Sequence, residues 1–224
     1  MNAKQKRNAF LVLDALAKSS IWSPELRIGI LCVLMKESGM IPRVESSYAN
    51  TSNERIRKVF GKKKLGRFHE NDKNLSILKK CPSAFFNQVY ANVAGNRGLG
   101  TGDGYNYRGR GFNQITGRAN YTLMQRLTGY ALVKKPGMLR YPECAAKCVI
   151  AFFERIYKKY EPLFGPPGLY VFNYEKAVLH AAWMNAGIGK KRESTAVQHA
   201  YKNAMKFLPE MTNIYNEWEE KQEV

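Results

Sequence analysis

Residues 23–39 read SPELRIGILCVLMKESG, and this stretch decides the expected fold. Ser23-Pro24-Glu25 supplies a capping hydroxyl, a proline for the first helical position and an acid in the first turn, so a helix begins here. The apolar residues of Leu26–Met35 lie nearly all round this helix, which is typical of a helix in the centre of a domain. It should reach about Glu37 and end at Gly39. This apolar run is only ten residues long and contains Arg27. We therefore interpret it as a buried helix and not as a membrane span.

Most of the remaining chain also reads as helix. A capping box at Thr51-Ser52-Asn53-Glu54 predicts a short helix to about Phe60, followed by a basic loop over 61–68. Residues 95–118 hold eight glycines and predict a long ordered loop with room for a short hairpin, and such loops are usually functional. Apolar periodicity and breakers predict the other helices over 3–19, 82–93, 118–128, 142–160, 174–186, 195–208 and 210–221.

The composition narrows the class of protein. With 45% hydrophobic and 12% aromatic residues the chain is too apolar to be disordered, and 224 residues suit one domain. We therefore expect a single mainly α domain over 1–224 with a minor loop or β lobe. The net charge of +18 fits nucleic acid, an anionic membrane face or an anionic wall polymer as partner, and charge alone does not choose among them.

The N-terminus and the cysteines indicate the compartment. Three basic residues precede the apolar stretch Ala9–Leu13, but this stretch is short and Asp14 interrupts it, so we expect an amphipathic helix and no secretory signal. The four cysteines form no CxxC pair, and no histidine stands at ligand spacing from them. We expect free buried thiols, made in a reducing cytosol, and no zinc site.

Two glutamates could carry acid–base chemistry. Glu37 ends the central helix, where partial desolvation and the negative end of the helix dipole both favour its protonated form, as a general acid requires. A neighbouring Lys36 would act in the opposite direction, and the alternative is a solvated helix-end glutamate. Glu45 lies eight residues on, in a loop. Glycoside hydrolysis uses such a pair, one group protonating the leaving oxygen and the other activating water.

The glycine-rich stretch offers a binding surface. Arg108-Gly109-Arg110-Gly111 allows close approach of the backbone, and Tyr105, Tyr107 and Phe112 alternate with it, which suits a flat sugar or a base. An RNA-binding patch and a structural loop with an Arg–Asp pair are the alternatives. A phosphate loop is excluded, because the stretch lacks GxxxxGK followed by Ser or Thr.

Three separated motifs carry a family resemblance. Val89-Tyr90-Ala91-Asn92 leads to Gly95-Asn96, then comes Gly102-Asp103-Gly104-Tyr105 with Tyr107–Gly111, and then Gln114–Tyr121. Together with Glu37-Ser38-Gly39 upstream, this order resembles the family 19 glycoside hydrolases, and in particular the endolysin-type members carried by bacteriophages. The motif core covers about 25–125, the resemblance reaches Asn185-Ala186-Gly187 more faintly, and a helical C-terminal part occupies 140–224.

The resemblance implies a lysozyme-like, mainly α fold with a substrate cleft between two lobes. It implies hydrolysis of β-1,4 bonds between N-acetylated amino sugars, typically with inversion and without a metal or cofactor. Glu37 matches the general acid, Glu45 the base, and Thr116 a hydroxyl that helps to hold the attacking water. Three departures are Lys36, where many members have His, a Glu37–Glu45 gap one residue shorter than in related endolysins, and Asn113 at a position that is usually apolar. The positions that match cleft-lining residues are Tyr107, Arg110, Gln114, Arg118 and Asn185.

Peptidoglycan is the expected substrate and chitin the runner-up. The endolysin-type motifs, the expected lack of a secretory signal and the charge all favour an anionic wall. We therefore expect a monomeric, muramidase-type endolysin that reaches the periplasmic wall after membrane permeabilisation, or else a virion-borne lysin. The basic stretch Arg55–Arg67, with seven basic and no acidic residues, is a solvated face or a contact to wall or outer-membrane polymers. The alternatives from another class are a nucleic-acid-binding protein and a non-catalytic virion protein.

Overall fold

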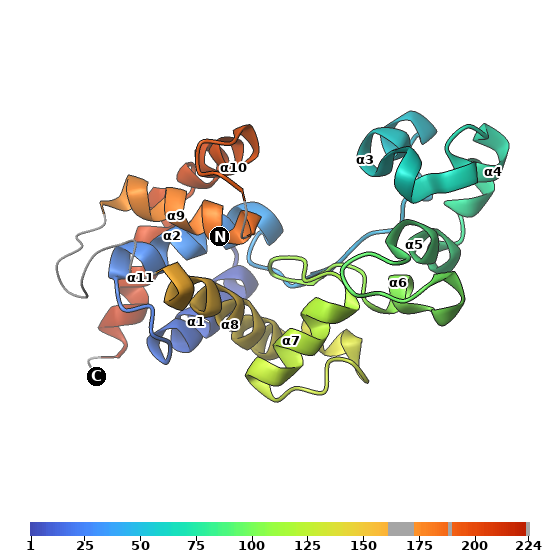
Figure 1. The fold of residues 1–224 in the computed structure, drawn as a ribbon. Helices are drawn as coiled ribbons and strands as arrows, with labels where there is room; N and C mark the ends of the chain where they lie inside the picture. Colours follow the sequence, from blue (N-terminus) through green and yellow to red (C-terminus); the bar gives the residue numbers. More distant parts are fainter. Residues whose placement is uncertain (161–172, 188–189, 223–224) are drawn as a thin grey trace. The chain divides into compact units, whose positions relative to one another are not determined.

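The computed structural model describes residues 1–160, 173–187 and 190–222. Within these residues the chain forms eleven α-helices and one two-stranded sheet (Figure 1). It divides into two compact units. Unit 1 comprises Met1–Pro42, Gly111–Asn113 and Leu139–Val224, and unit 2 comprises Arg43–Arg110 and Gln114–Met138.

Unit 1 is built around a buried central helix, as the sequence predicts. Helix α2 (Pro24–Ser38) packs chiefly against α9 (Tyr174–Ala186), and also contacts α10 (Thr195–Met205), α11 (Leu208–Glu220) and α1 (Ala3–Ala17) (Figure 1). Every residue from Ile28 to Leu34 is buried, so α2 contacts neighbours on all faces. Helix α8 (Pro142–Tyr160) packs on α1 and completes the unit.

The ends of α2 follow from its sequence. The Ser23 hydroxyl accepts a hydrogen bond from the Leu26 N–H at 3.2 Å and so caps the first turn. Gly39 adopts the left-handed conformation with φ 62°, and its N–H donates to the Met35 carbonyl. Both signals were predicted, and both are confirmed.

Unit 2 has a separate aromatic core. Strand β1 (Arg43–Val44) pairs with β2 (Arg110–Gly111), and 3-10 turns lie at η1 (Gly66–Phe68), η2 (Leu99–Thr101) and η3 (Pro136–Arg140), the last leading back to unit 1. The core consists of Ile56, Phe60, Leu65, Leu75, Leu78, Phe85, Phe86 and Val89. The helices of this unit are α3 (Asn53–Leu65), α4 (Asp72–Leu78), α5 (Pro82–Tyr90), α6 (Asp103–Asn106) and α7 (Arg118–Thr128).

The basic loop predicted over 61–68 is wrong. The first helical part of α3 does end near Phe60 as predicted, since Gly61 is not helical, with φ 66° and ψ 174°. A short helical turn then reaches Leu65, and Phe60 and Leu65 on either side of Gly61 are both buried in the aromatic core. The cap of α3 is Ser52, one residue later than predicted, and α4 was not predicted at all. The one-turn helix α6 lies inside the predicted loop and was not predicted either. The other helices lie within a few residues of their predicted ranges, and α5 ends at Tyr90 instead of 93.

The glycine-rich stretch is an ordered loop interrupted by short elements. A bridge between Arg110 and Ile115 forms a small hairpin at its end. Asp103, only 2% exposed, receives two hydrogen bonds from the Arg97 guanidinium at 2.9 and 3.0 Å. The contact with Arg97 holds the pKa of Asp103 below its usual range despite burial. The structural Arg–Asp pair considered from the sequence is therefore present.

The mainly α architecture with a central buried helix and a minor β element is confirmed. A single catalytic domain over 1–224 and a cleft between lobes stay predictions. No described helix is long and apolar enough to cross a membrane. Cys32, Cys144 and Cys148 are buried thiols as predicted, whereas the Cys81 thiol is exposed at the start of α5.

Candidate functional site

The predicted site residues fall into two groups, one in each unit. Glu37 and Asn185 belong to unit 1. Glu45, Gln114, Thr116, Tyr107, Arg110 and Arg118 belong to unit 2.

Glu37 lies at the end of α2, beside the end of α9. Its Oε1 atom accepts from Lys36 Nζ at 2.8 Å and from Asn185 Nδ2 at 3.3 Å. The Glu37 side chain is 28% exposed and forms an ion pair with Lys36. Its role as a general acid stays a prediction.

Backbone pairing next to β1 fixes Glu45. Its N–H donates to the Gly109 carbonyl at 2.8 Å, and the Gly109 N–H donates back to Glu45 Oε2 at 3.1 Å. These two hydrogen bonds hold both the backbone and the carboxylate of Glu45 against the loop that carries β2.

Two tyrosine hydroxyls complete the surroundings of the Glu45 carboxylate. Tyr90 Oη donates to Oε1 at 2.8 Å, and Tyr48 Oη lies 3.4 Å from the same atom. Burial and then the negative charge of Glu45 raise the pKa of Tyr90 above its usual range, and they shift the pKa of Tyr48 in the same direction. Both hydroxyls therefore keep their protons and remain donors to the carboxylate.

The aromatic core of unit 2 holds these two tyrosines in place. The Tyr90 ring lies parallel to Phe86 with centroids 6.1 Å apart, and Tyr48 packs between Phe60 and Phe85 at 5.0 and 5.1 Å. Packing on fixed rings limits the rotamers of both tyrosines. The carboxylate is thus oriented by rigid groups from α5 and from the segment before α3.

Gln114 and Thr116 meet Glu45 around Gly109. A Cβ atom on Gly109 would lie 2.7 Å from Gln114 Oε1, 3.3 Å from Thr116 Oγ1 and 3.4 Å from Glu45 Oε2. A side chain at position 109 would therefore displace the Gln114 amide and crowd Thr116 and Glu45. Gln114 has φ 55°, an uncommon conformation for a residue with a side chain, and such strain clusters at functional sites.

The Thr116 hydroxyl has acceptor capacity left for a water molecule. It donates its proton to the Gln114 carbonyl at 2.8 Å. Because a hydroxyl has one proton and two lone pairs, the oxygen can still accept a hydrogen bond. A carboxylate and an accepting hydroxyl near one point are what general-base activation of water requires.

Tyr107 and Arg110 have packing and hydrogen-bonding roles inside unit 2. Both are only 6% exposed. Tyr107 Oη donates to the Val133 carbonyl at 3.1 Å, while the Arg110 guanidinium donates to the Asn106 carbonyl at 2.6 Å and to Tyr121 Oη. Their predicted contact with substrate stays a prediction.

Arg118 begins α7 and lines a shallow groove of about 350 Å³ together with Thr122 and Arg126. Its backbone N–H donates to Asn96 Oδ1 at 2.7 Å. Its Nε atom is buried and has no hydrogen-bond partner among the described residues. The contact of Arg118 with substrate also stays a prediction.

The two tyrosine donors to Glu45 were not predicted from the sequence. Tyr48 and Tyr90 are 42 positions apart, and nothing in their local sequence indicates that they share one carboxylate. Tyr90 does stand in the first motif, which was the available signal. Among the described residues, no group of three or more His, Cys, Asp or Glu side chains is arranged to hold a metal ion.

Comparison with known proteins supports a relationship over part of the chain. No family model matches it. Over 51 residues it is 46% identical to a glycosyl hydrolase family 19 domain-containing protein of Haemophilus influenzae. This match covers 23% of the chain and only 26% of the relative, so the likeness to family 19 is established for that segment.

Proposed function

We propose that this protein is a glycoside hydrolase that cleaves β-1,4 bonds of bacterial peptidoglycan by an acid–base, inverting mechanism, as a muramidase-type endolysin does. The observation that carries the proposal is the oriented Glu45 carboxylate, with Thr116 and Gln114 beside it. The partial likeness to a family 19 domain-containing protein supports the reaction class.

Glu45 acts as the base in this proposal. Tyr90 and the Gly109 amide stabilise its negative charge and fix its direction. Thr116 accepts a hydrogen bond from the water, and Glu45 removes a proton from the same water as it attacks the anomeric carbon. Such positioning of a nucleophile is where much of the rate enhancement of a hydrolase arises.

Glu37 acts as the acid. Lys36 and Asn185 both donate to Oε1. Oε2 is therefore the oxygen that would carry the proton and pass it to the leaving glycosidic oxygen. Inversion requires the two carboxyl groups to lie roughly 6.5–9.5 Å apart around the bound sugar, which leaves room for the water.

Peptidoglycan is the proposed substrate because the chain carries a net charge of +18 and the wall polymers are anionic. The proposed site of action is the bacterial cell wall. A virion-borne lysin would use the same chemistry, and mass spectrometry of purified virions distinguishes it from an endolysin. The proposed reaction requires no metal or cofactor.

The rate at which a suspension of permeabilised Gram-negative cells loses turbidity tests the proposed residues. We expect Glu37→Gln and Glu45→Gln each to reduce this rate of clearing by at least about 100-fold, because each removes a proton-transfer group. Glu54→Gln is the matched control, since Glu54 is exposed on α3 and contacts neither group. Undiminished clearing by Glu37→Gln would remove Glu37 from the mechanism, and the same result with Glu45→Gln would remove the base.

Analysis of released sugars tests the substrate. Wild-type protein should release fragments with new reducing N-acetylmuramic acid ends from purified peptidoglycan, first formed with inverted anomeric configuration. Release of chitin oligomers without any effect on peptidoglycan would assign a chitinase instead. Binding of duplex DNA with no hydrolysis of either glycan would favour the nucleic-acid-binding alternative.

A further inference from the structure

Unit 2 carries a concentrated positive charge that the proposed glycosidase does not use. Residues 53–80, which include α3, η1 and α4, hold ten basic and three acidic residues in one eighth of the chain. The structure shows which of these charges are neutralised and which face solvent.

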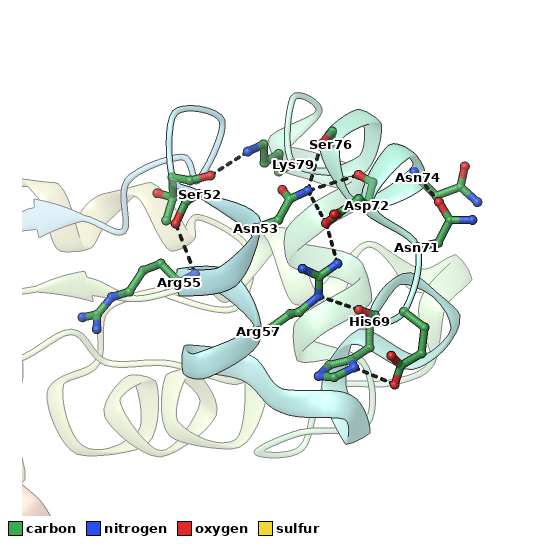
Figure 2. Close-up of polar contacts among 12 residues, drawn as sticks. Ser52, Asn53, Arg55, Arg57, His69, Asn71, Asp72, Asn74, Ser76 and Lys79 are labelled. Atoms are coloured by element: carbon green, nitrogen blue, oxygen red, sulfur yellow. Dashed lines mark hydrogen bonds and ion pairs between the residues drawn. The ribbon is translucent and has the colours of Figure 1, made fainter.

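Two of the three acidic residues already form hydrogen bonds and ion pairs within this segment. Asp72 accepts from Asn53 Nδ2 at 3.0 Å and pairs with Arg57 Nη2 at 2.6 Å, which lowers its pKa (Figure 2). Glu70 pairs with His69 at 3.0 Å and with Lys62 at 3.4 Å. The hydrogen bonds of Asn53 and Arg57 also tie α3 to α4, so the surface that these helices support is rigid.

An apolar groove opens on this surface. It has a volume of about 450 Å³, and its lining includes Arg67, Phe68, Ile77 and Ala84. The Ile77 side chain is 62% exposed, although the burial of an isoleucine is normally favourable. The Arg67 guanidinium lies 5.1 Å from the centre of the Phe68 ring, at the wall of the groove.

Three cations surround the exposed isoleucine. Lys73 precedes Ile77 by four residues on α4, a spacing that places side chains next to one another on a helix. Lys80 lies in the turn that follows α4, where its N–H donates to the Ile77 carbonyl at 3.2 Å. Arg67 contributes from the groove wall. All three are exposed, and none forms an ion pair within the part of the chain that the structure describes.

We propose that this α4 docking face, defined as Arg67, Lys73, Ile77, Lys80 and the groove between them, binds an anionic lipid surface. Cations placed around an apolar centre match phosphate headgroups above acyl chains. The proposal does not depend on the glycosidase activity.

Other polyanions match this face less well. A purely polar polyanion would make no apolar contact with the Ile77 side chain or with the groove. Single-stranded nucleic acid binding normally uses exposed aromatic rings for stacking, and the large apolar side chains exposed between 53 and 80 are Val59 and Ile77.

Co-sedimentation with vesicles tests the proposal. The wild-type protein should partition onto vesicles of phosphatidylglycerol and phosphatidylcholine in equal parts, and not onto phosphatidylcholine alone. The triple variant Arg67→Gln, Lys73→Gln, Lys80→Gln should lose roughly 100-fold in partition coefficient, because each cation near an anionic surface contributes about fivefold. Ile77→Ser should have a partition coefficient on the anionic vesicles that is roughly fivefold lower than that of the wild type.

A matched triple variant separates this face from net charge. Lys4→Gln, Lys18→Gln, Lys202→Gln removes three exposed cations of unit 1 and should stay within about threefold of wild type. Equal losses in the two triple variants would overturn the proposal, because binding would then follow net charge. Absence of wild-type binding to anionic vesicles would overturn it as well, and accompanying binding to duplex DNA would assign the face to nucleic acid.

Discussion

A few hydrogen bonds hold the Glu45 carboxylate in place, and the bond from Tyr90 Oη, at 2.8 Å, is the shortest of them. Tyr90→Phe removes this donor and keeps the ring that packs on Phe86. Since hydrogen bonds to charged groups contribute about 1.5–3 kcal/mol, we expect wall-lysis rates to fall by roughly tenfold or more.

Tyr48→Phe is the matched control, since its hydroxyl lies 3.4 Å from the same oxygen. We expect a smaller effect on the rate. A Tyr90→Phe rate equal to that of the wild type would show that this tyrosine only packs.

His180 links the stability of unit 1 to pH. It is 5% exposed on α9, and Nδ1 lies 2.9 Å from the Lys176 carbonyl. Burial, followed by the positive charge of Arg192, lowers the pKa of His180 from 6.5 to about 4. The unfolded chain therefore takes up the proton at a higher pH, so stability present above pH 6.5 is lost as the pH falls towards 4.

Urea unfolding checks this expectation. Between pH 7.5 and pH 5 the free energy of unfolding should decrease by about 2 kcal/mol on account of His180. In His180→Gln this part of the decrease should disappear. An unchanged pH dependence in the variant would mean that another group is responsible.

At the scale of elements, the contact between α2 and α9 is close enough to require glycine. A Cβ atom at Gly29 would lie 2.7 Å from the Ala177 carbonyl oxygen, which belongs to the backbone and cannot rotate away. Gly29→Ala should therefore lower the free energy of unfolding by roughly 1–2 kcal/mol, because the overpacking exceeds the gain in helix propensity.

Gly137→Ala is the corresponding control in η3, where a Cβ atom would meet nothing within 4 Å. We expect its stability to stay within about 0.5 kcal/mol of wild type in the same denaturation experiment. Stabilisation by Gly29→Ala would show that the two helices can separate without loss.

At the scale of the whole molecule, the charge of +18 opposes compaction. Salt screens this repulsion, since the Debye length falls from about 30 Å at 0.01 M to about 10 Å at 0.1 M. We expect the thermal unfolding midpoint at pH 7 to rise when NaCl is increased from 10 to 100 mM, as measured by circular dichroism. A decrease would mean that ion pairs such as Arg57–Asp72 outweigh the general repulsion.

The elements whose signals are local follow from the sequence alone. The cap at Ser23, the all-round apolar pattern of α2 and the stop at Gly39 lie within 17 consecutive residues, so α2 could be predicted with its place in the core. The sequence does not indicate the helical turn that follows Gly61. There, burial of Leu65 in the aromatic core outweighs the local preference of glycine and lysines for a loop.

Only the tertiary structure decided which side chains share a contact. The pairing of β1 with β2 brings Glu45 to Gly109, and the aromatic core brings Tyr90 to the same carboxylate. Tertiary packing also places Phe112 in the core of unit 1, although the chain before Gly111 and the chain after Asn113 belong to unit 2. These contacts join positions up to 64 residues apart, and packing selects them through shape and burial, which a local sequence pattern does not encode.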